Sequence, residues 1–231
     1  MPATVGSTTT RARSAPVAAA IVCHAHPLHG GMMHFKVVFR AAKALQSAGL
    51  AVLRFNFRGV GRSEGTYDGG RGEADDARAS LDEMARRFPG LPLVAGGFSF
   101  GAVVGLHVGA SDDRVGAVFL LGCPAAFDDP TILLDRPPPL DAGGKPRLFV
   151  QGEKDQFGSA EALQALVEPW PEGRSVVVVP GTNHFFDGRL DELQGAIEAG
   201  RTADVDNLAH SLKGSASNFC AVQFVATAYE L

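Results

Sequence analysis

The 231-residue sequence has few cysteines, a single tryptophan and no strong excess of charge of either sign. Its three cysteines, Cys23, Cys123 and Cys220, are odd in number and far apart, so we expect reduced thiols in the cytoplasm and no disulfide framework. The formal net charge of -4 offers no basic surface, so neither nucleic acid nor anionic lipid is expected as a partner. No apolar run approaches the roughly 18 residues that a membrane span needs.

From residue 17 onward, short apolar runs alternate with segments of helical periodicity. Helices are predicted over 35–49 and 72–88 and near 159–168 and 187–199, with a further helix directly after residue 99. Six apolar runs have the length and composition of buried strands: 17–23, 50–57, 91–97, 115–122, 146–152 and 175–181. Continuous apolar strands that alternate with helices predict an α/β fold, a three-layer α/β/α sandwich around a mostly parallel, doubly wound sheet.

The third apolar run ends in Gly97-Phe98-Ser99-Phe100-Gly101. In a G-x-S-x-G pattern the serine lies at the apex of a strained strand-to-helix turn, and the two glycines let neighbouring elements approach. A chain with 28 glycines also produces such patterns by chance, so the rest of the sequence has to support the interpretation.

Two further side chains follow later strands. Asp155 comes just after the run 146–152, and His184 comes just after the run 175–181. Ligands and reacting groups of open parallel sheets lie at the carboxyl ends of the strands, and serine, acid, histidine is the chain order of a hydrolytic triad on such a sheet. Glu153 is the other acid in the same loop, but it leaves the strand at once, so Asp155 is preferred.

The loops after the first two strands have competing interpretations. In the first loop the competing interpretation is a metal site, because imidazole is a common zinc ligand and four histidines fall within eleven residues: His24, His26, His29 and His34. No carboxylate of the kind such a site needs follows nearby, and Pro27 interrupts the loop. In the loop after the second strand, Arg58 and Arg62 either bind an anion or form structural hydrogen bonds, and the sequence leaves both open.

Together these motifs resemble the small, lidless serine hydrolases of the α/β-hydrolase superfamily, close to dienelactone-hydrolase-like esterases. The resemblance covers residues 17–199 and rests on the stretches 26–31, 55–65, 97–101, 152–155 and 183–186. It implies Ser99 as nucleophile, His184 as general base and Asp155 as the acid that orients it. It also implies an oxyanion hole from the backbone N–H groups of Phe100 and Leu28.

The same resemblance implies a carboxylesterase-like activity on a small ester or acyl substrate through an acyl-serine intermediate. Neither a cofactor nor a metal is implied. True dienelactone hydrolases have cysteine where this chain has Ser99, so that substrate is not implied. With no inserted lid visible, we expect a shallow site and a small acyl group.

The two ends of the chain depart from this family. Residues 1–16 lack acids and any alternating apolar pattern, which predicts a disordered leader and a sheet without its usual N-terminal hairpin. The edge left open favours self-association, so a homodimer is one expectation. Residues 200–231 form a helical tail in which the stretch 210–215, HSLKGS, resembles the signature of histidine phosphotransfer domains, with His210 as phosphoacceptor.

That second resemblance covers about thirty residues, whereas a phosphotransfer domain is a four-helix bundle. The alternative interpretation of the tail is an amphipathic helix that lies on the hydrolase or on a second subunit. Two alternative functions therefore stay open beside the hydrolase. One is a phosphorelay module whose partner is a receiver domain, and the other is a catalytically inactive hydrolase fold used for protein interaction.

Overall fold

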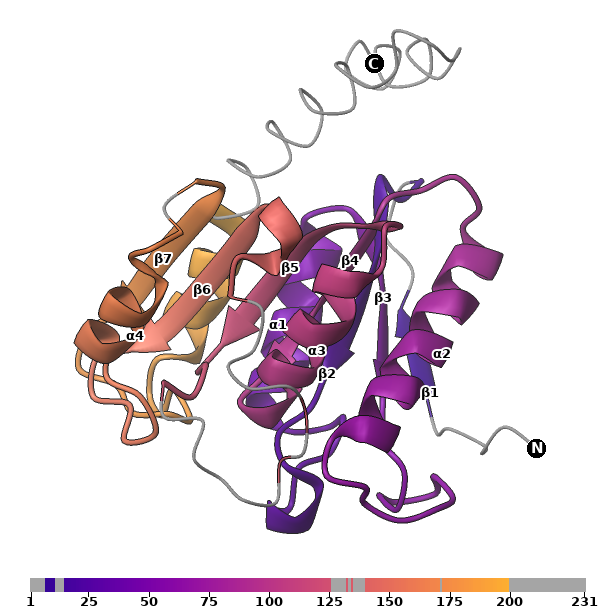
Figure 1. Ribbon diagram of the computed structural model, residues 1–231, viewed down its shortest axis with the longest axis horizontal. Helices are drawn as coiled ribbons and strands as arrows, with labels where there is room; N and C mark the ends of the chain where they lie inside the picture. Colours follow the sequence, from indigo (N-terminus) through magenta and orange to yellow (C-terminus); the bar gives the residue numbers. More distant parts are fainter. Residues whose placement is uncertain are drawn as a thin grey trace, which may run out of the picture.

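The computed structural model describes residues 7–10, 15–125, 132, 134, 140–170 and 172–199. Its centre is a seven-stranded sheet with helices on both faces (Figure 1). The strand order is β1-β3-β2-β4-β5-β6-β7, and every neighbouring pair is parallel except β1 with β3. The predicted fold class is confirmed, because the six apolar runs form the six parallel strands.

The elements follow the predicted order along the chain. The parallel strands are β2 (Ala18–Cys23), β3 (Leu50–Phe55), β4 (Leu93–Phe98), β5 (Val115–Leu121), β6 (Arg147–Gly152) and β7 (Arg174–Val179). The helices are α1 (Lys36–Ser47), α2 (Arg71–Arg87), α3 (Phe100–Ser111) and α4 (Ala160–Val167), with a further helical stretch over 190–199. Short 3-10 turns lie at η1 (Pro27–His29) and η2 (Ala142–Gly144). None of the described helices is long and apolar enough to cross a membrane.

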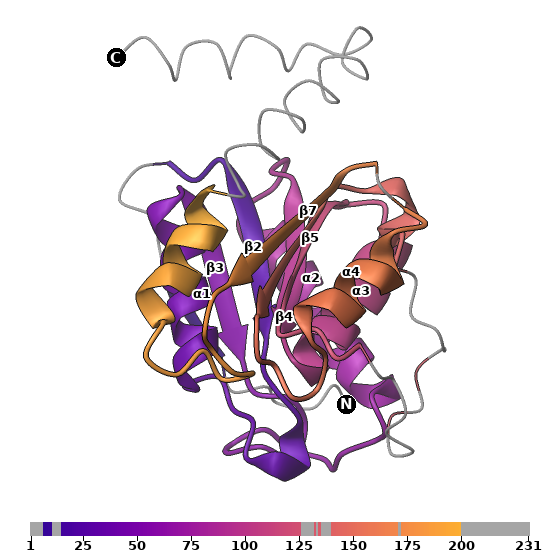
Figure 2. The same ribbon diagram turned by 90° about the vertical axis from the view of Figure 1, so that its left-hand side faces the viewer.

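The sheet separates two apolar cores, and Figure 2 shows the three layers edge-on. Helix α1 and the 190–199 helix cover one face, while α2, α3 and α4 cover the other. Successive strand residues alternate between the cores: Ile21 belongs to the core under α2 and α3, whereas Ala20 and Val22 belong to the core under α1. Because both faces are covered, β2 and β3 are buried along their whole length.

The N-terminal segment corrects the prediction of a wholly disordered leader. Residues Ser7–Thr10 form β1, which pairs antiparallel with β3 from Phe55 to Val52. Ser7–Thr10 need no apolar alternation, because backbone hydrogen bonds hold an edge strand and threonine favours extended backbone. The edge of β3 is therefore covered and β1 becomes the edge strand, while the homodimer stays a prediction.

Glycines bring α3 directly against the sheet. A Cβ atom at Gly105 would lie 2.7 Å from the Cα atom of Gly96 in β4, so the helix and the strand touch backbone to backbone. No other residue type permits this approach without moving one of the elements. The helix that begins at the candidate serine is thereby held at a fixed height over β4. The C-terminal tail, with His210 and its phosphotransfer resemblance, lies outside the described residues.

Candidate active site

The three predicted site residues follow three different strands at the carboxyl edge of the sheet. Ser99 comes directly after β4, Asp155 lies three residues beyond β6, and His184 lies five residues beyond β7. Strands β4, β5, β6 and β7 are consecutive neighbours and run in the same direction, so these loops gather at one edge.

Ser99 occupies a strained turn between β4 and α3. Its φ of 57° and ψ of -122° lie in a region that residues with a side chain rarely adopt. The backbone N–H of Ser99 donates to the Leu121 carbonyl at the end of β5, at 2.9 Å. The turn is thus tied to the neighbouring strand, and the surrounding structure holds the serine in a conformation it would not choose alone.

The glycines on either side of Ser99 have the role that the motif predicts. A Cβ atom at Gly97 would lie 2.4 Å from the Cys23 carbonyl oxygen, and one at Gly101 would lie 2.4 Å from the carbonyl oxygens of both Cys23 and His24. Any side chain at either position would push the turn away from the end of β2. The pattern therefore brings the loop after β2 against the base of the serine turn.

Asp155 and His184 form a buried hydrogen-bonded pair. The distance between His184 Nδ1 and Asp155 Oδ2 is 2.8 Å, and the two side chains are 3% and 0% exposed. The carboxylate accepts this hydrogen bond, so the Nδ1 atom carries the ring proton and is the donor. The neutral imidazole then has its lone pair on Nε2, which is the form that a general base requires.

Two more groups hold the Asp155 carboxylate. The backbone N–H of Phe157 donates to Oδ1 at 2.8 Å, and the side-chain amide of Gln151 donates to Oδ2 at 2.9 Å. With His184, the carboxylate accepts three hydrogen bonds. A buried charge needs such partners, so these donors make an ionised Asp155 compatible with its burial.

The imidazole of His184 packs beside the residue that precedes Ser99. Its ring centroid lies 4.8 Å from that of Phe98, and a Cβ atom at Gly122 would lie 3.2 Å from two of its ring atoms. Phe157 and Phe185 flank the same ring, with centroids at 4.7 and 5.2 Å. Glycine after β5 therefore leaves the space in which the imidazole approaches the serine turn.

The two predicted oxyanion donors have different surroundings. Phe100 is the first residue of α3, so its N–H is one of the helix's amide groups that have no partner within the helix. The N–H of Leu28 donates to His26 Nδ1 at 3.2 Å, within its own turn, and the Leu28 side chain is exposed. The role of both amides stays a prediction.

His24, the first histidine of the loop after β2, has a structural role. The backbone N–H of Phe57 donates to His24 Nε2 at 3.0 Å, and His24 Nδ1 lies 2.6 Å from the Ala25 carbonyl oxygen. A neutral ring with its proton on Nδ1 satisfies both contacts, and it ties this loop to the loop after β3. Among the described residues, no group of three or more His, Cys, Asp or Glu side chains is placed to hold a metal ion.

Burial lowers the pKa of His24 from 6.5 to about 4. In the unfolded chain this histidine is protonated below pH 6.5, whereas in the folded protein it is protonated only below about pH 4. The free energy of unfolding therefore falls as the pH falls through this window. We expect the free energy of unfolding to drop by about 3 kcal/mol from this group alone. Urea titrations between pH 7 and 4 should show this slope, and His24→Gln should lack it; equal slopes in both proteins would contradict the assignment.

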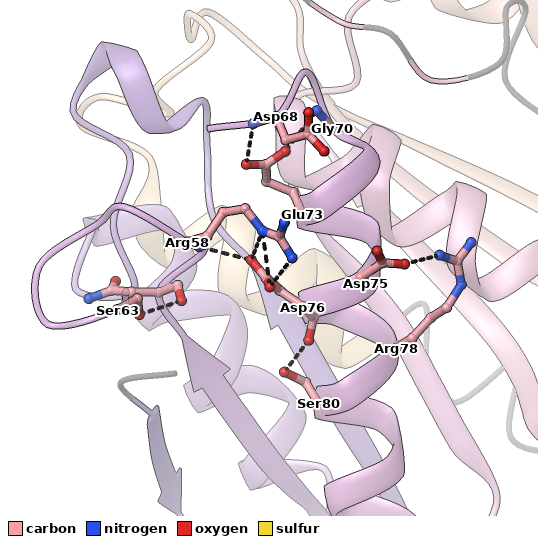
Figure 3. A network of polar contacts seen from close by, with 10 residues as sticks. Arg58, Ser63, Asp68, Gly70, Glu73, Asp75, Asp76, Arg78 and Ser80 are labelled. Atoms are coloured by element: carbon pink, nitrogen blue, oxygen red, sulfur yellow. Dashed lines mark hydrogen bonds and ion pairs between the residues drawn. The ribbon is translucent and has the colours of Figure 1, made fainter. Parts of the chain in front are cut away.

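Arg58 is paired with an acid of its own chain. Its guanidinium pairs with Asp76 of α2 at 2.9 Å, and its backbone N–H donates to the same carboxylate at 2.8 Å (Figure 3). Gly72 lies so close to the guanidinium that a Cβ atom there would be 2.0 Å from Nη1. Of the two alternatives, the structural one fits Arg58, while Arg62 is exposed.

Neither described cysteine is suited to act as the nucleophile. Cys23 and Cys123 are both buried and free. Burial raises the pKa of Cys123 to about 12 and raises that of Cys23 as well, so both remain protonated thiols at neutral pH.

Sequence reasoning missed two residues that shape the site, Gln151 and Gly122. Gln151 was hidden inside an apolar strand run, although a polar residue in a strand buried on both faces is itself a signal. Gly122 follows β5 directly and has a φ of 52°, and the sequence pattern alone does not distinguish it from an ordinary turn glycine.

Comparison with known proteins identifies the family of the chain. Residues 18–207 match the family model described as an alpha/beta hydrolase domain. An uncharacterized protein of Rickettsia prowazekii (strain Madrid E) is 33% identical over 192 residues, which cover 80% of this chain and 77% of the relative.

Two solved structures are similar over most of the chain. An alpha-beta serine hydrolase homologue from Coxiella burnetii is 36% identical, with a TM-score of 0.74 and coverage of 84% of this chain and 90% of the other. A serine hydrolase without a lid, from Xanthomonas campestris, is 34% identical, with a TM-score of 0.76 and coverage of 86% and 88%. The chain belongs to the alpha/beta hydrolase family.

Proposed function

We propose that the protein is a carboxylesterase-like serine hydrolase in which Ser99, His184 and Asp155 form a catalytic triad. The observation that carries this proposal is the buried hydrogen bond between His184 and Asp155, next to a serine held in a strained turn. The carboxylate fixes the tautomer in which Nε2 is free, and a free Nε2 can accept the proton of a nearby nucleophile. Ser99 supplies the nucleophile on the adjoining loop.

In the proposed first step, His184 Nε2 takes the proton from Ser99 Oγ as the oxygen attacks the carbonyl carbon of the substrate. The hydrogen bond between these two atoms belongs to the proposal; such bonds often tighten only when substrate is bound. The imidazolium that forms is stabilised by Asp155, and it then gives its proton to the departing alcohol. The product of this step is an acyl group on Ser99.

In the second step, His184 takes a proton from water, and the hydroxide attacks the acyl carbon. The carboxylic acid leaves as Ser99 recovers its proton from His184. The negative oxygen formed in each step needs backbone donors, for which we propose Phe100 N–H and an amide of the loop after β2. Leu28 can serve only if its N–H releases His26 Nδ1.

Apolar side chains beside the imidazole favour a small uncharged acyl group. Phe157 and Phe185 are 52% and 38% exposed, although large apolar side chains are usually buried. An open hollow of about 600 Å³ adjoins the same loop, with Ala125, Phe157 and Leu166 among its lining residues. Such a surface binds acyl chains by apolar contact, and Asp155, the acid among its described lining residues, is already paired with His184. Because Cys23 and Cys123 are free thiols, we place the enzyme in the cytoplasm.

A hydrolysis screen over p-nitrophenyl esters of graded chain length tests this function. We expect turnover of acetate and butyrate that declines toward long chains and is unaffected by chelators. Inhibition by a chelator would instead support a metal site, and the absence of turnover on every ester would support an inactive fold used for protein interaction.

A further inference from the structure

We infer that Gln151 is a positioning residue that fixes the Asp155 carboxylate and, through it, the imidazole of His184. The inference rests on the proposed function, because it assigns a second support to the acid of that triad. Gln151 is the fifth residue of β6, fully buried, four positions before Asp155. Its side chain lies at the carboxyl end of the strand, where the loops after β5 and β6 meet.

The contacts of the Gln151 amide define its orientation. The backbone N–H of Cys123 donates to Oε1 at 2.9 Å, so this atom is the oxygen. The Nε2 atom faces only acceptors: Asp155 Oδ2 at 2.9 Å, the Gly158 carbonyl at 2.7 Å and the Cys123 carbonyl at 3.3 Å. The reversed amide would place an oxygen against three oxygens. One side chain thus makes hydrogen bonds to the loops after β5 and β6. Rotating the amide would break these bonds.

Gln151 and His184 share one oxygen of Asp155. Both donate to Oδ2, at 2.9 and 2.8 Å, while Oδ1 is held by the Phe157 amide. Two fixed donors, one to each oxygen, leave the carboxylate no freedom to rotate about its last bond. The direction of the His184 hydrogen bond, and with it the direction of Nε2, is therefore set before substrate binds.

The same amide closes the two loops on one another. Gly158 approaches the β5 loop so closely that a Cβ atom there would lie 2.6 Å from the Ala125 nitrogen, and Ala125 N–H donates to the Phe157 carbonyl. These backbone contacts keep the loops in place around the glutamine. The hydrogen bond from Gln151 to Asp155 is the contact that extends this support to the proposed triad.

The first test replaces Gln151 by leucine, which has no hydrogen-bonding group. We expect kcat to fall 10- to 100-fold, the range for one lost hydrogen bond to a charged group, while KM changes less than threefold because Gln151 does not touch substrate. Leu81→Ala, a buried change in α2, is the stability control and should leave kcat of the folded enzyme unchanged. A folded Gln151→Leu enzyme with kcat within twofold of wild type would overturn the inference.

A double-mutant cycle separates positioning from general packing. If Gln151 acts through Asp155, Gln151→Leu should change kcat less than twofold in an Asp155→Ala background. Equal losses in both backgrounds would overturn the inference.

Gln151→Glu provides a second variant that keeps Oε1 and the shape of the side chain. Its ionised form faces Asp155, so its kcat should decline as the pH rises from 6 to 9, relative to wild type; parallel profiles would contradict positioning.

A spectroscopic measurement distinguishes failure of this inference from failure of the proposed function. The His184 Nδ1 proton, bonded to a buried carboxylate, should give an NMR signal well downfield of the amides, and it should be absent in His184→Ala. We expect Gln151→Leu to move this signal, whether or not the enzyme hydrolyses esters. An unmoved signal would reject positioning by Gln151, whereas absent turnover with a displaced signal would reject only the hydrolase proposal.

Discussion

Ester hydrolysis by Ser99→Ala is expected to be about 10⁴- to 10⁶-fold slower in kcat/KM than by the wild-type enzyme. The hydroxyl is the atom that attacks the carbonyl, and no other group in the proposed site can form the acyl intermediate. Steady-state rates on p-nitrophenyl acetate measure the loss directly. Near-native turnover by the alanine variant would exclude the proposed mechanism.

Ser99→Gly is the matched control for backbone strain. At a φ of 57°, glycine is unstrained whereas alanine keeps the strain of serine, so the glycine variant should be more stable than the alanine variant by about 1 kcal/mol. Both should be equally inactive. Chemical denaturation measures the difference in stability, and activity in the glycine variant, which also has no hydroxyl, would contradict the role of Ser99 as nucleophile.

Replacing His184 by alanine should slow ester hydrolysis by about 10³- to 10⁵-fold, because no base remains to take the Ser99 proton. The change also leaves the buried Asp155 without its imidazole partner, so a lower melting temperature is expected as well. Rates should therefore be measured well below that temperature, with folding checked by circular dichroism.

His34→Ala is the matched control for the loss of a histidine. His34 is exposed and belongs to the loop that suggested a metal site, so the hydrolase proposal predicts unchanged rates and the metal alternative predicts a loss. Asp155→Asn keeps the shape of the acid but removes its charge. We expect it to slow ester hydrolysis by about 10³-fold, which is more than His34→Ala and no more than His184→Ala. Full activity in His184→Ala beside a loss in His34→Ala would reverse the assignment.

The parallel strands and their helices could be predicted because each buried strand needs a continuous apolar run. Strand β3, for example, reads LAVLRF between a glycine-ended helix and a glycine-rich loop, and every residue of it is buried. The positions of Ser99, Asp155 and His184 at one sheet edge followed from the same argument. Periodicity and chain order are sufficient for features that depend on burial and topology.

The features that the sequence did not reveal depend on particular hydrogen bonds and not on burial or periodicity. Strand β1 forms because the edge of β3 offers unpaired amides, and nothing in Ser7–Thr10 specifies that partner. The engagement of Leu28 N–H by His26 and the orientation of the Gln151 amide depend on loop geometry that no local pattern encodes. These contacts require coordinates, and two of them bear on how the site works.

The identity of the nucleophile is tested most directly by covalent labelling with a fluorophosphonate. The reagent reacts with an activated serine hydroxyl and leaves a stable adduct, which intact-mass measurement counts and peptide mapping locates. The account predicts one adduct per chain, on Ser99, formed in step with loss of esterase activity and absent in Ser99→Ala. An esterase that loses no activity to the reagent, or an adduct that forms equally well in Ser99→Ala, would contradict it.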